Sequence, residues 1–137
     1  MISDYGEEFI PKRSTKQSAG YDLVIPQDLD MMPNVWYTVD TGIHLEKGDI
    51  KDHQCLLVLP RSGLGFKYKM KLANTIGLID SDYRDSIKAC ISVEEPLFLE
   101  KGTRFLQFIV SDFGLVANEV PPTEVRKSGL GSTGLKG

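Results

Sequence analysis

Ser86-Ile87-Lys88-Ala89-Cys90-Ile91-Ser92-Val93 decides the fold class, because its polar and apolar residues alternate along the chain. Successive side chains of a strand point to opposite faces, so the four apolar residues at odd positions would share one buried face. Similar strand signals recur over residues 20–26, 35–39, 55–59, 105–110 and 115–120, and turn-forming residues separate them. This spacing is typical of a β-sandwich or barrel. We therefore predict a single all-β domain over residues 1–125, with one short helix over 62–70.

Just before that strand the chain reads Gly77-Leu78-Ile79-Asp80-Ser81-Asp82-Tyr83-Arg84. In a strand, the carboxylates of Asp80 and Asp82 would share a face, where they repel unless solvent, a cation or a partner separates them. Aspartate and serine are also common turn formers, so a simple hairpin turn is an equal alternative. The residue types alone leave both interpretations open.

Composition limits the classes of function. A net charge of −3 argues against a nucleic-acid binder that relies on bulk electrostatics, so an anionic ligand would need local basic groups or a metal ion. Cys55 and Cys90 lie far apart, and His44 and His53 do not complete a zinc site with them at any usual spacing. Both cysteines are expected to pack as small buried hydrophobes. The N-terminus shows no signal peptide and no membrane span, so we expect a cytoplasmic protein (in the host cytoplasm if the source is viral).

Pro60-Arg61-Ser62-Gly63 ends an apolar strand and begins the one helical segment. The N-terminus of a helix offers free N–H groups and a positive dipole end, which together favour a phosphate group. Arg61 would add a forked donor and Ser62 a hydroxyl. The alternative is structural, with Ser62 as the N-cap and Arg61 as a surface residue.

Two polar residues interrupt predicted strands. Gln107 is the only polar residue within 105–110, and burying its amide without partners costs about 1–3 kcal/mol. It must therefore pair with backbone inside the sheet or face a polar site. Asp22 lies in the short strand over 20–26, where most acids are solvated edge charges.

The last residues, 126–137, are rich in glycine and hold only two large apolar side chains, Leu130 and Leu135. Such a segment cannot bury enough surface to order itself, so we predict a flexible tail or a lid that orders on a ligand. Residues 129–134 match the letters of the dinucleotide-binding glycine fingerprint but lack the strand and helix that it requires. A glycine loop that wraps a polyphosphate is the remaining functional possibility.

Taken together, five segments resemble, in order and spacing, the five motifs of the trimeric dUTPase family. They are residues 19–23, 60–64, 77–84, 102–107 and 129–134, and the resemblance runs from about residue 11 to 134. It implies a jelly-roll-like β-clip subunit that assembles as a homotrimer. It also implies three active sites, each built from several subunits, and Mg²⁺-dependent hydrolysis of dUTP to dUMP and pyrophosphate.

The resemblance assigns the chemistry residue by residue. Asp80 matches the general base that deprotonates the attacking water, and Gln107 matches a glutamine near the α-phosphate. Tyr83 matches the tyrosine that packs under the deoxyribose and excludes a 2′-hydroxyl. The remaining matches are Arg61, Ser62 and Gly63 for the phosphates, Asp22 for the hydrated Mg²⁺ through water, Gly131, Ser132 and Thr133 in the tail loop that holds the γ-phosphate, and Ile76 and Lys88 in the hairpin whose main chain reads uracil.

The chain departs from the family pattern at three positions. Leu130 stands where the family has a phenylalanine that stacks on uracil, which predicts weaker stacking. Arg126 lies one residue nearer to that position than the usual tail arginine. Asp85 replaces a glycine, and a third carboxylate there would raise the pKa of the base or point to solvent.

Two alternatives to a dUTPase were considered. A dCTP deaminase shares the fold and the Arg-Ser pair, but the glutamate that serves deamination aligns with Cys90, which cannot do that work. A dUTPase-like binding or regulatory protein would explain Leu130 and Asp85. The presence of Asp80, Tyr83 and Gln107 argues against it.

Overall fold

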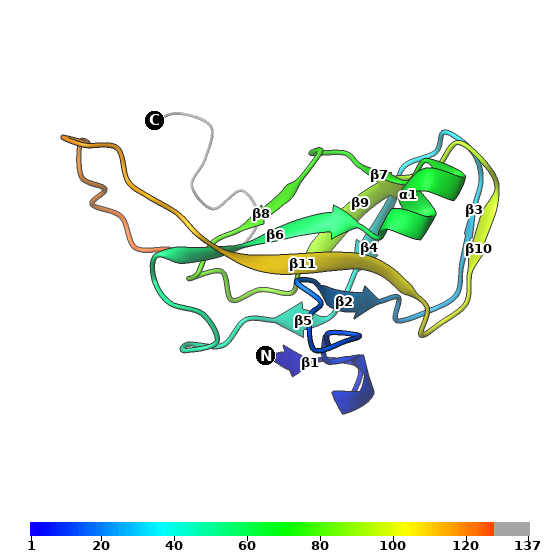
Figure 1. Cartoon of the computed structure of the whole chain (residues 1–137), viewed down its shortest axis with the longest axis horizontal. Helices are drawn as coiled ribbons and strands as arrows, with labels where there is room; N and C mark the ends of the chain where they lie inside the picture. Colours follow the sequence, from blue (N-terminus) through cyan, green and yellow to red (C-terminus); the bar gives the residue numbers. More distant parts are fainter. Residues whose placement is uncertain (128–137) are drawn as a thin grey trace.

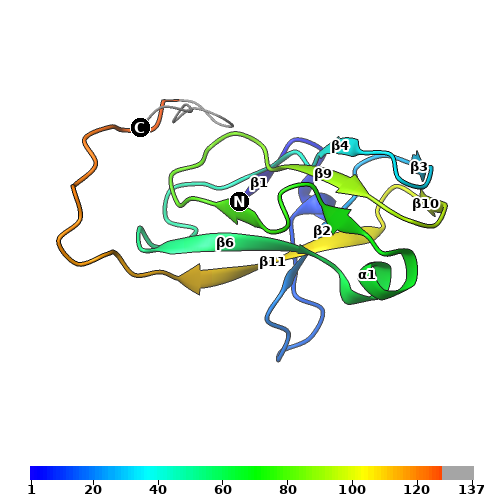
Figure 2. The ribbon, with the colours of Figure 1, turned by 90° about the horizontal axis from the view of Figure 1, so that it is seen from above.

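The protein is built from two antiparallel sheets that face each other. In the computed structural model, which describes residues 1–127, the first sheet has the order β2-β11-β6-β8 and the second β4-β9-β7. Their bounds are β2 Tyr21–Val24, β11 Arg104–Asp112, β6 Gln54–Pro60, β8 Gly77–Ile79, β4 Tyr37–Asp40, β9 Lys88–Ser92 and β7 Lys71–Leu72. Figure 2 shows β6 and β11 on one side of the molecule and β4 and β9 on the other. The predicted all-β class is confirmed.

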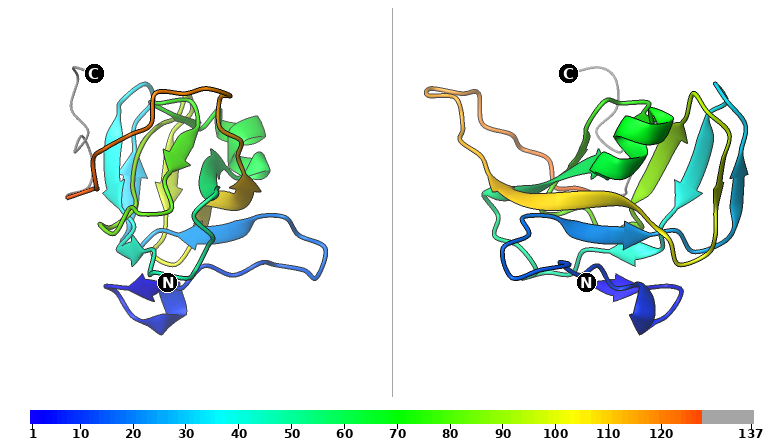
Figure 3. Two further views of the ribbon diagram at one scale, coloured as in Figure 1. Left: turned by 90° about the vertical axis from the view of Figure 1, so that its left-hand side faces the viewer. Right: turned by 45° about the vertical axis from the view of Figure 1, so that its right-hand side comes forward.

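Two short strand pairs complete the domain. β1 (Ile2–Ser3) pairs with β5 (Ile43–His44), and β3 (Leu29–Met31) pairs with β10 (Leu97–Leu99). The β3–β10 pair lies at the end of the molecule away from the segment that follows β11 (Figures 1 and 3). The helices are the 3-10 turn η1 (Glu7–Phe9) and α1 (Ser62–Tyr68). No helix within residues 1–127 is long and apolar enough to cross a membrane.

The core lies between the two sheets and follows the alternation read from the sequence. The four apolar residues of the alternating stretch, Ile87, Ala89, Ile91 and Val93, are all buried. On the opposite face, Ser92 of β9 and Ser86 of the preceding loop are buried as well, whereas Lys88 on that face is exposed. Cys55 is buried as predicted, whereas Cys90 is only half-buried.

Three expectations about local structure were wrong. Residues 115–120 form no strand: no other strand in the described chain pairs with them, and Leu115 and Val116 stay exposed. They belong to an extended segment that leaves the body after β11 and turns back toward β8 (Figures 1 and 2). The predicted hairpin is also absent, since β8 pairs with β6 and β9 pairs with β4 and β7. Residues 80–87 are therefore a loop between the two sheets, called here the β8–β9 loop. The helix ends at Tyr68 rather than residue 70, because Lys69 adopts the left-handed conformation that terminates helices.

The pairing of β6 with its two neighbours fixes where Asp80 and Arg61 lie. It pairs with β11 from Gln54 to Pro60 and with β8 through Leu56 opposite Ile79 and Val58 opposite Gly77. Asp80, which follows Ile79, therefore lies at the start of β6. Arg61 and α1 follow the other end.

Gly77 tests this register. A Cβ at Gly77 would lie 2.9 Å from the Val58 Cβ, so an alanine there forces β8 away from β6. We expect Gly77→Ala to lower the free energy of unfolding by about 1–3 kcal/mol, as overpacked cores do. Urea denaturation at fixed protein concentration measures it. Gly65→Ala in α1 is the control, because nothing lies within 4 Å of its Cβ and alanine favours helix. Equal unfolding midpoints for the two variants would contradict the register.

Candidate active site

A polar cleft lies where β2, β11 and β6 meet the start of α1. Its volume is about 420 Å³, and its lining includes Gly20, Asp22, Arg61, Ser62 and Gln107. The sheet register explains this grouping, because Gln107 is the direct partner of Asp22 on one side and of Leu59 on the other. Cross-strand partners point to the same face, and Arg61 follows two residues after Leu59. Three segments that are distant in sequence, around residues 14–22, 59–62 and 107–109, thus contribute to one surface.

The amide of Gln107 meets both expectations raised for it. Its Nε2 donates to the Pro60 carbonyl over 3.4 Å, so it pairs with backbone, and it also lines the polar cleft. Its Oε1 lies against Gly20, where an added Cβ would come within 2.4 Å of that oxygen. The glycine therefore leaves the room that the amide occupies.

Asp22 is held by two arginines rather than solvated at an edge. Its Oδ1 lies 3.2 Å from the Arg61 Nε, and its Oδ2 accepts from the Ser14 hydroxyl at 2.7 Å and lies 3.6 Å from an Arg104 nitrogen. The Asp22 side chain is only 11% exposed, whereas that of Arg61 is 35% exposed and that of Arg104 50%. Two guanidinium groups around one carboxylate leave a local excess of positive charge open to solvent. That arrangement suits an anion such as a phosphate.

Ser62 does not cap the helix, so the structural alternative for it was wrong. The N-cap residue is Arg61, which has no side-chain capping bond, and Ser62 is the first helical residue. Ser62 and Gly63 are both exposed at the mouth of the cleft. Ser14 also lines this cleft, and Arg104 lies beside it through its contact with Asp22; neither residue was assigned a role from the sequence. The position of Arg104, directly before the apolar run that contains Gln107, could have identified it from the sequence. No sequence pattern distinguishes Ser14.

Asp80 and Asp82 form a second cluster, on the β8–β9 loop. The guanidinium of Arg126 lies on both carboxylates: its Nη2 donates to Asp80 in a short bond, and its Nε donates to Asp82 at 2.8 Å. It also lies over the ring of Tyr83, 5.9 Å from the centroid. The cation that two neighbouring carboxylates require thus comes from the chain itself. The hydrogen bond to Asp82 raises the pKa of Arg126, so the arginine stays charged.

Tyr83 is buried in this loop, as are Ser86 and Ile87. Its hydroxyl donates to the Ser86 carbonyl at 3.0 Å, and burial, followed by the charge of Asp85, raises its pKa above that of a free tyrosine. Asp85 itself is exposed. Ile76 is exposed before β8, and the Lys88 ammonium lies 3.3 Å from the Ser86 hydroxyl and 4.0 Å from Asp40.

The two clusters are not brought together within one chain. Asp80 follows Ile79 and so lies level with Cys55, whereas Arg61 follows Pro60; the six residues between these levels span about 20 Å along β6. Of the tail residues proposed for the site, Leu130, Gly131, Ser132 and Thr133 lie outside the described residues. Within residues 1–127, no group of three or more His, Cys, Asp or Glu side chains is placed to hold a metal ion.

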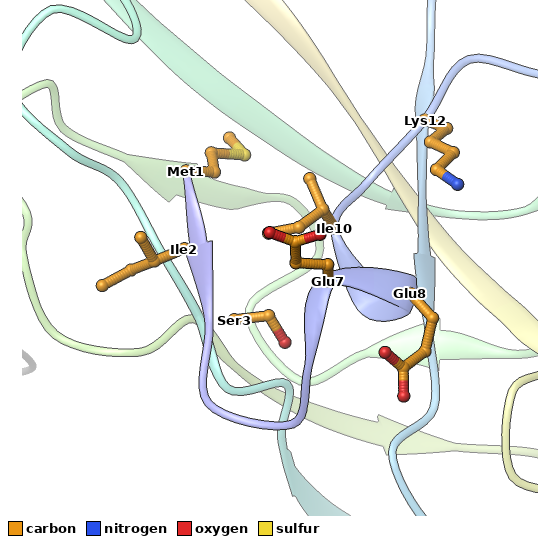
Figure 4. A pocket seen from close by; sticks show the side chains of 7 residues that line it. All are labelled: Met1, Ile2, Ser3, Glu7, Glu8, Ile10 and Lys12. Atoms are coloured by element: carbon orange, nitrogen blue, oxygen red, sulfur yellow. The ribbon is translucent and has the colours of Figure 1, made fainter.

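A larger cavity lies elsewhere, under the N-terminal segment. Its volume is about 580 Å³, and Figure 4 shows the side chains that line it: Met1, Ile2, Ser3, Glu7, Glu8, Ile10 and Lys12. None of the residues predicted for the site lies in it. The smaller cleft, by contrast, places the Arg61 guanidinium beside the nearly buried Asp22 carboxylate and the Gln107 amide.

Known proteins resemble this chain over nearly its whole length. The dUTPase family model matches residues 7–134. A deoxyuridine 5′-triphosphate nucleotidohydrolase of Corynebacterium jeikeium is 36% identical over 92% of this chain and 86% of its own. One of Mannheimia succiniciproducens is 33% identical over 98% and 93%.

Solved structures agree with the sequence matches. The crystal structure of a dUTPase from Streptococcus mutans superposes with a TM-score of 0.72, at 29% identity over 85% of this chain and 96% of that one. A Staphylococcus bacteriophage 80alpha dUTPase mutant bound to dUpNHpp has the same fold, with a TM-score of 0.71 at 18% identity over 90% and 95%. The jelly-roll-like β fold expected from the sequence is thereby confirmed. The chain belongs to the dUTPase family.

Proposed function

We propose that the chain hydrolyses dUTP to dUMP and pyrophosphate in a site shared between subunits, with Asp80 as the general base. The proposal of a shared site rests on one observation: the cleft around Arg61 and the cluster around Asp80 lie at opposite ends of β6. Hydrolysis of dUTP is the activity of the family, and it keeps uracil out of DNA while supplying the precursor of dTTP. Nothing in the matches favours a deaminase or a catalytically inactive binding protein.

The cleft is the phosphate-binding half of this site. Arg61, Ser62 and Gly63 would bind the triphosphate, and Asp22 fixes the Arg61 side chain through its Nε so that the outer nitrogens face the ligand. Gln107 would hold the α-phosphate and the neighbouring water, because its amide already lies at the floor of the cleft. The local excess of positive charge overcomes the net charge of −3.

The β8–β9 loop is the half that activates water. A general base must lie within about 3 Å of the proton that it removes, or one water away. Asp80 would accept a proton from the water that attacks the α-phosphorus. The bond between the α-phosphorus and the bridging oxygen breaks, and pyrophosphate leaves with that oxygen. Tyr83 would pack under the deoxyribose. Arg126 donates to one oxygen of the Asp80 carboxylate in the free chain, so it competes with the attacking water for that oxygen.

We propose a homotrimer with three such sites, as the family resemblance implies; the separation of the two clusters supports sites shared between subunits. Asp80 and Arg61 of one chain are too far apart to act on one α-phosphate, whereas a closed ring of identical chains lets the loop of one subunit face the cleft of the next. Main-chain groups beside Ile76 and Lys88 would read the uracil. Leu130, Gly131, Ser132 and Thr133 would close over the nucleotide from the tail, which we propose is a separate flexible segment over residues 126–137.

Mg²⁺ is the proposed cofactor. Both oxygens of Asp22 already have protein partners, so this carboxylate fits a metal only through water, and no cage of protein ligands is present in the described residues. The triphosphate itself would supply most of the ligands, which is the usual mode for Mg²⁺. When bound, the ion neutralises phosphate charge during the attack. A related structure, from phage phi11 of S. aureus, is described as holding a structural Mg(II) ion. We expect the enzyme to work in the cytoplasm, where no nucleic acid or membrane partner is needed.

Asp80→Asn tests the base. We expect it to lower kcat by roughly 10²–10⁴-fold, because asparagine cannot accept the proton from water. Pyrophosphate release from dUTP measures the rate, and calorimetry with a non-hydrolysable analogue measures binding, which should persist. Asp82→Asn is the matched control, since it is on the same loop and contacts the same arginine. An equal fall in kcat in the two variants would show that Asp80 is not the general base.

Gly20→Ala tests Gln107 without altering it. The new methyl group would displace the amide oxygen, which sits 2.4 Å from the ideal Cβ position, by swinging the end of a flexible side chain. We expect kcat to fall roughly ten- to a hundredfold, with little change in melting temperature, because small displacements of catalytic groups are costly. Gly114→Ala, with open space around its Cβ, should leave both unchanged. Full activity of Gly20→Ala would show that the amide position is immaterial.

A further inference from the structure

His44 connects the N-terminal segment to the β8–β9 loop. It lies on β5, with its side chain 21% exposed. Its Nε2 is 2.9 Å from the Asp4 carboxylate, and its Nδ1 is 2.8 Å from the Arg84 carbonyl oxygen. One imidazole therefore spans two segments that are each 40 residues away in sequence.

Both neighbours of the ring are acceptors. A carboxylate and a backbone carbonyl can only receive hydrogen bonds, so both ring nitrogens must carry a proton for both contacts to hold. The neutral imidazole has a single N–H and must lose one of the two hydrogen bonds. The geometry therefore favours the imidazolium form.

The surrounding charges act in the same direction. Asp4, from the loop after β1, raises the pKa of His44 most; Asp40 of β4 and the Arg84 carbonyl also raise it, against the opposing effect of burial. Lys88 of β9 lies against Asp40, and the Arg84 guanidinium turns away to the Ser81 and Tyr83 carbonyls. A raised pKa means that the double contact is complete at low pH and is lost as pH rises through the folded-state value.

The Arg84 carbonyl belongs to the part of the loop that holds Tyr83 and Asp80. Other side-chain ties of this loop include the Tyr83 hydroxyl to the Ser86 carbonyl, the Ser81 hydroxyl to the Asp52 carbonyl and the Thr41 hydroxyl to the Ile87 carbonyl. Guanidinium groups make the rest: Arg84 donates to the Ser81 carbonyl, and Arg126 donates to Asp80 and Asp82. Phenol and guanidinium groups keep their protons through neutral pH, and the serine and threonine hydroxyls do not titrate there. Among these ties, only the one made by His44 changes its charge near neutrality.

We infer that His44 is a positioning residue whose protonated ring fixes the β8–β9 loop, so that its deprotonation sets the alkaline limit of dUTP hydrolysis. This inference rests on the proposed role of the loop. The alkaline limit would then belong to a side chain that touches no substrate.

Asp4→Asn separates positioning from simple support. Asparagine keeps an acceptor for Nε2 but removes the charge that raises the pKa of His44, so we expect both the His44 titration and the alkaline inflection of kcat/KM to move to lower pH together. NMR of the imidazole C–H resonances follows the titration, and pyrophosphate release from dUTP with Mg²⁺ gives kcat/KM. Above the inflection, kcat/KM should fall roughly two- to tenfold, the value of one hydrogen bond. A loss of stability alone would not move the inflection.

Two further variants complete the test. His44→Gln should remove the alkaline inflection and leave a reduced, pH-independent kcat/KM on that side, whereas His53→Gln should leave it in place. An alkaline inflection that stays where it is in an active Asp4→Asn enzyme, while the His44 titration shifts, would overturn the inference and spare the proposed function. Absence of dUTP hydrolysis at every pH in the unaltered protein would overturn both.

Discussion

The pairing of β6 with β8 and β11 is the constraint on which the rest of the structure depends. Leu56 opposite Ile79 fixes Asp80 at one end of the strand, and Leu59 opposite Gln107 fixes the cleft near the other. Because a strand cannot shorten, no side-chain movement within one chain can close a gap of about 20 Å between the groups. Because the sheet keeps the two groups apart, a complete site would require more than one subunit.

Arginine–carboxylate pairs lie in both halves of the proposed site. Asp22 holds Arg61 and Arg104 at the cleft, and Arg126 covers Asp80 and Asp82 on the loop. Each half is neutralised in part, which lowers the cost of bringing like charges together in the free chain. A triphosphate with its cation would compete for the same guanidinium groups, so binding of substrate and release of the base are linked in this account.

The sequence predicted what depends on local pattern and missed what depends on pairing. Alternation identified the buried face of β9, and the isolated amide of Gln107 correctly indicated a polar site within an apolar strand. Residues 115–120 are also largely apolar, but no strand in the described chain pairs with them. The loop after β8 joins two sheets, which was missed because the periodicity of a strand does not indicate its partner. Contacts such as Arg126 on Asp80 and His44 on Arg84 join residues 46 and 40 positions apart, which no local signal encodes.

The most direct test of the shared site is complementation between two inactive variants. Asp80→Asn and Arg61→Gln would be made separately, mixed in equal amounts, unfolded together and refolded, and then assayed for pyrophosphate release from dUTP. If each site takes Asp80 from one subunit and Arg61 from another, random mixing leaves about one site in four intact, so about a quarter of the unaltered activity should return. Activity that stays at the average of the two separate variants would contradict the account, because each chain would then build its own complete site.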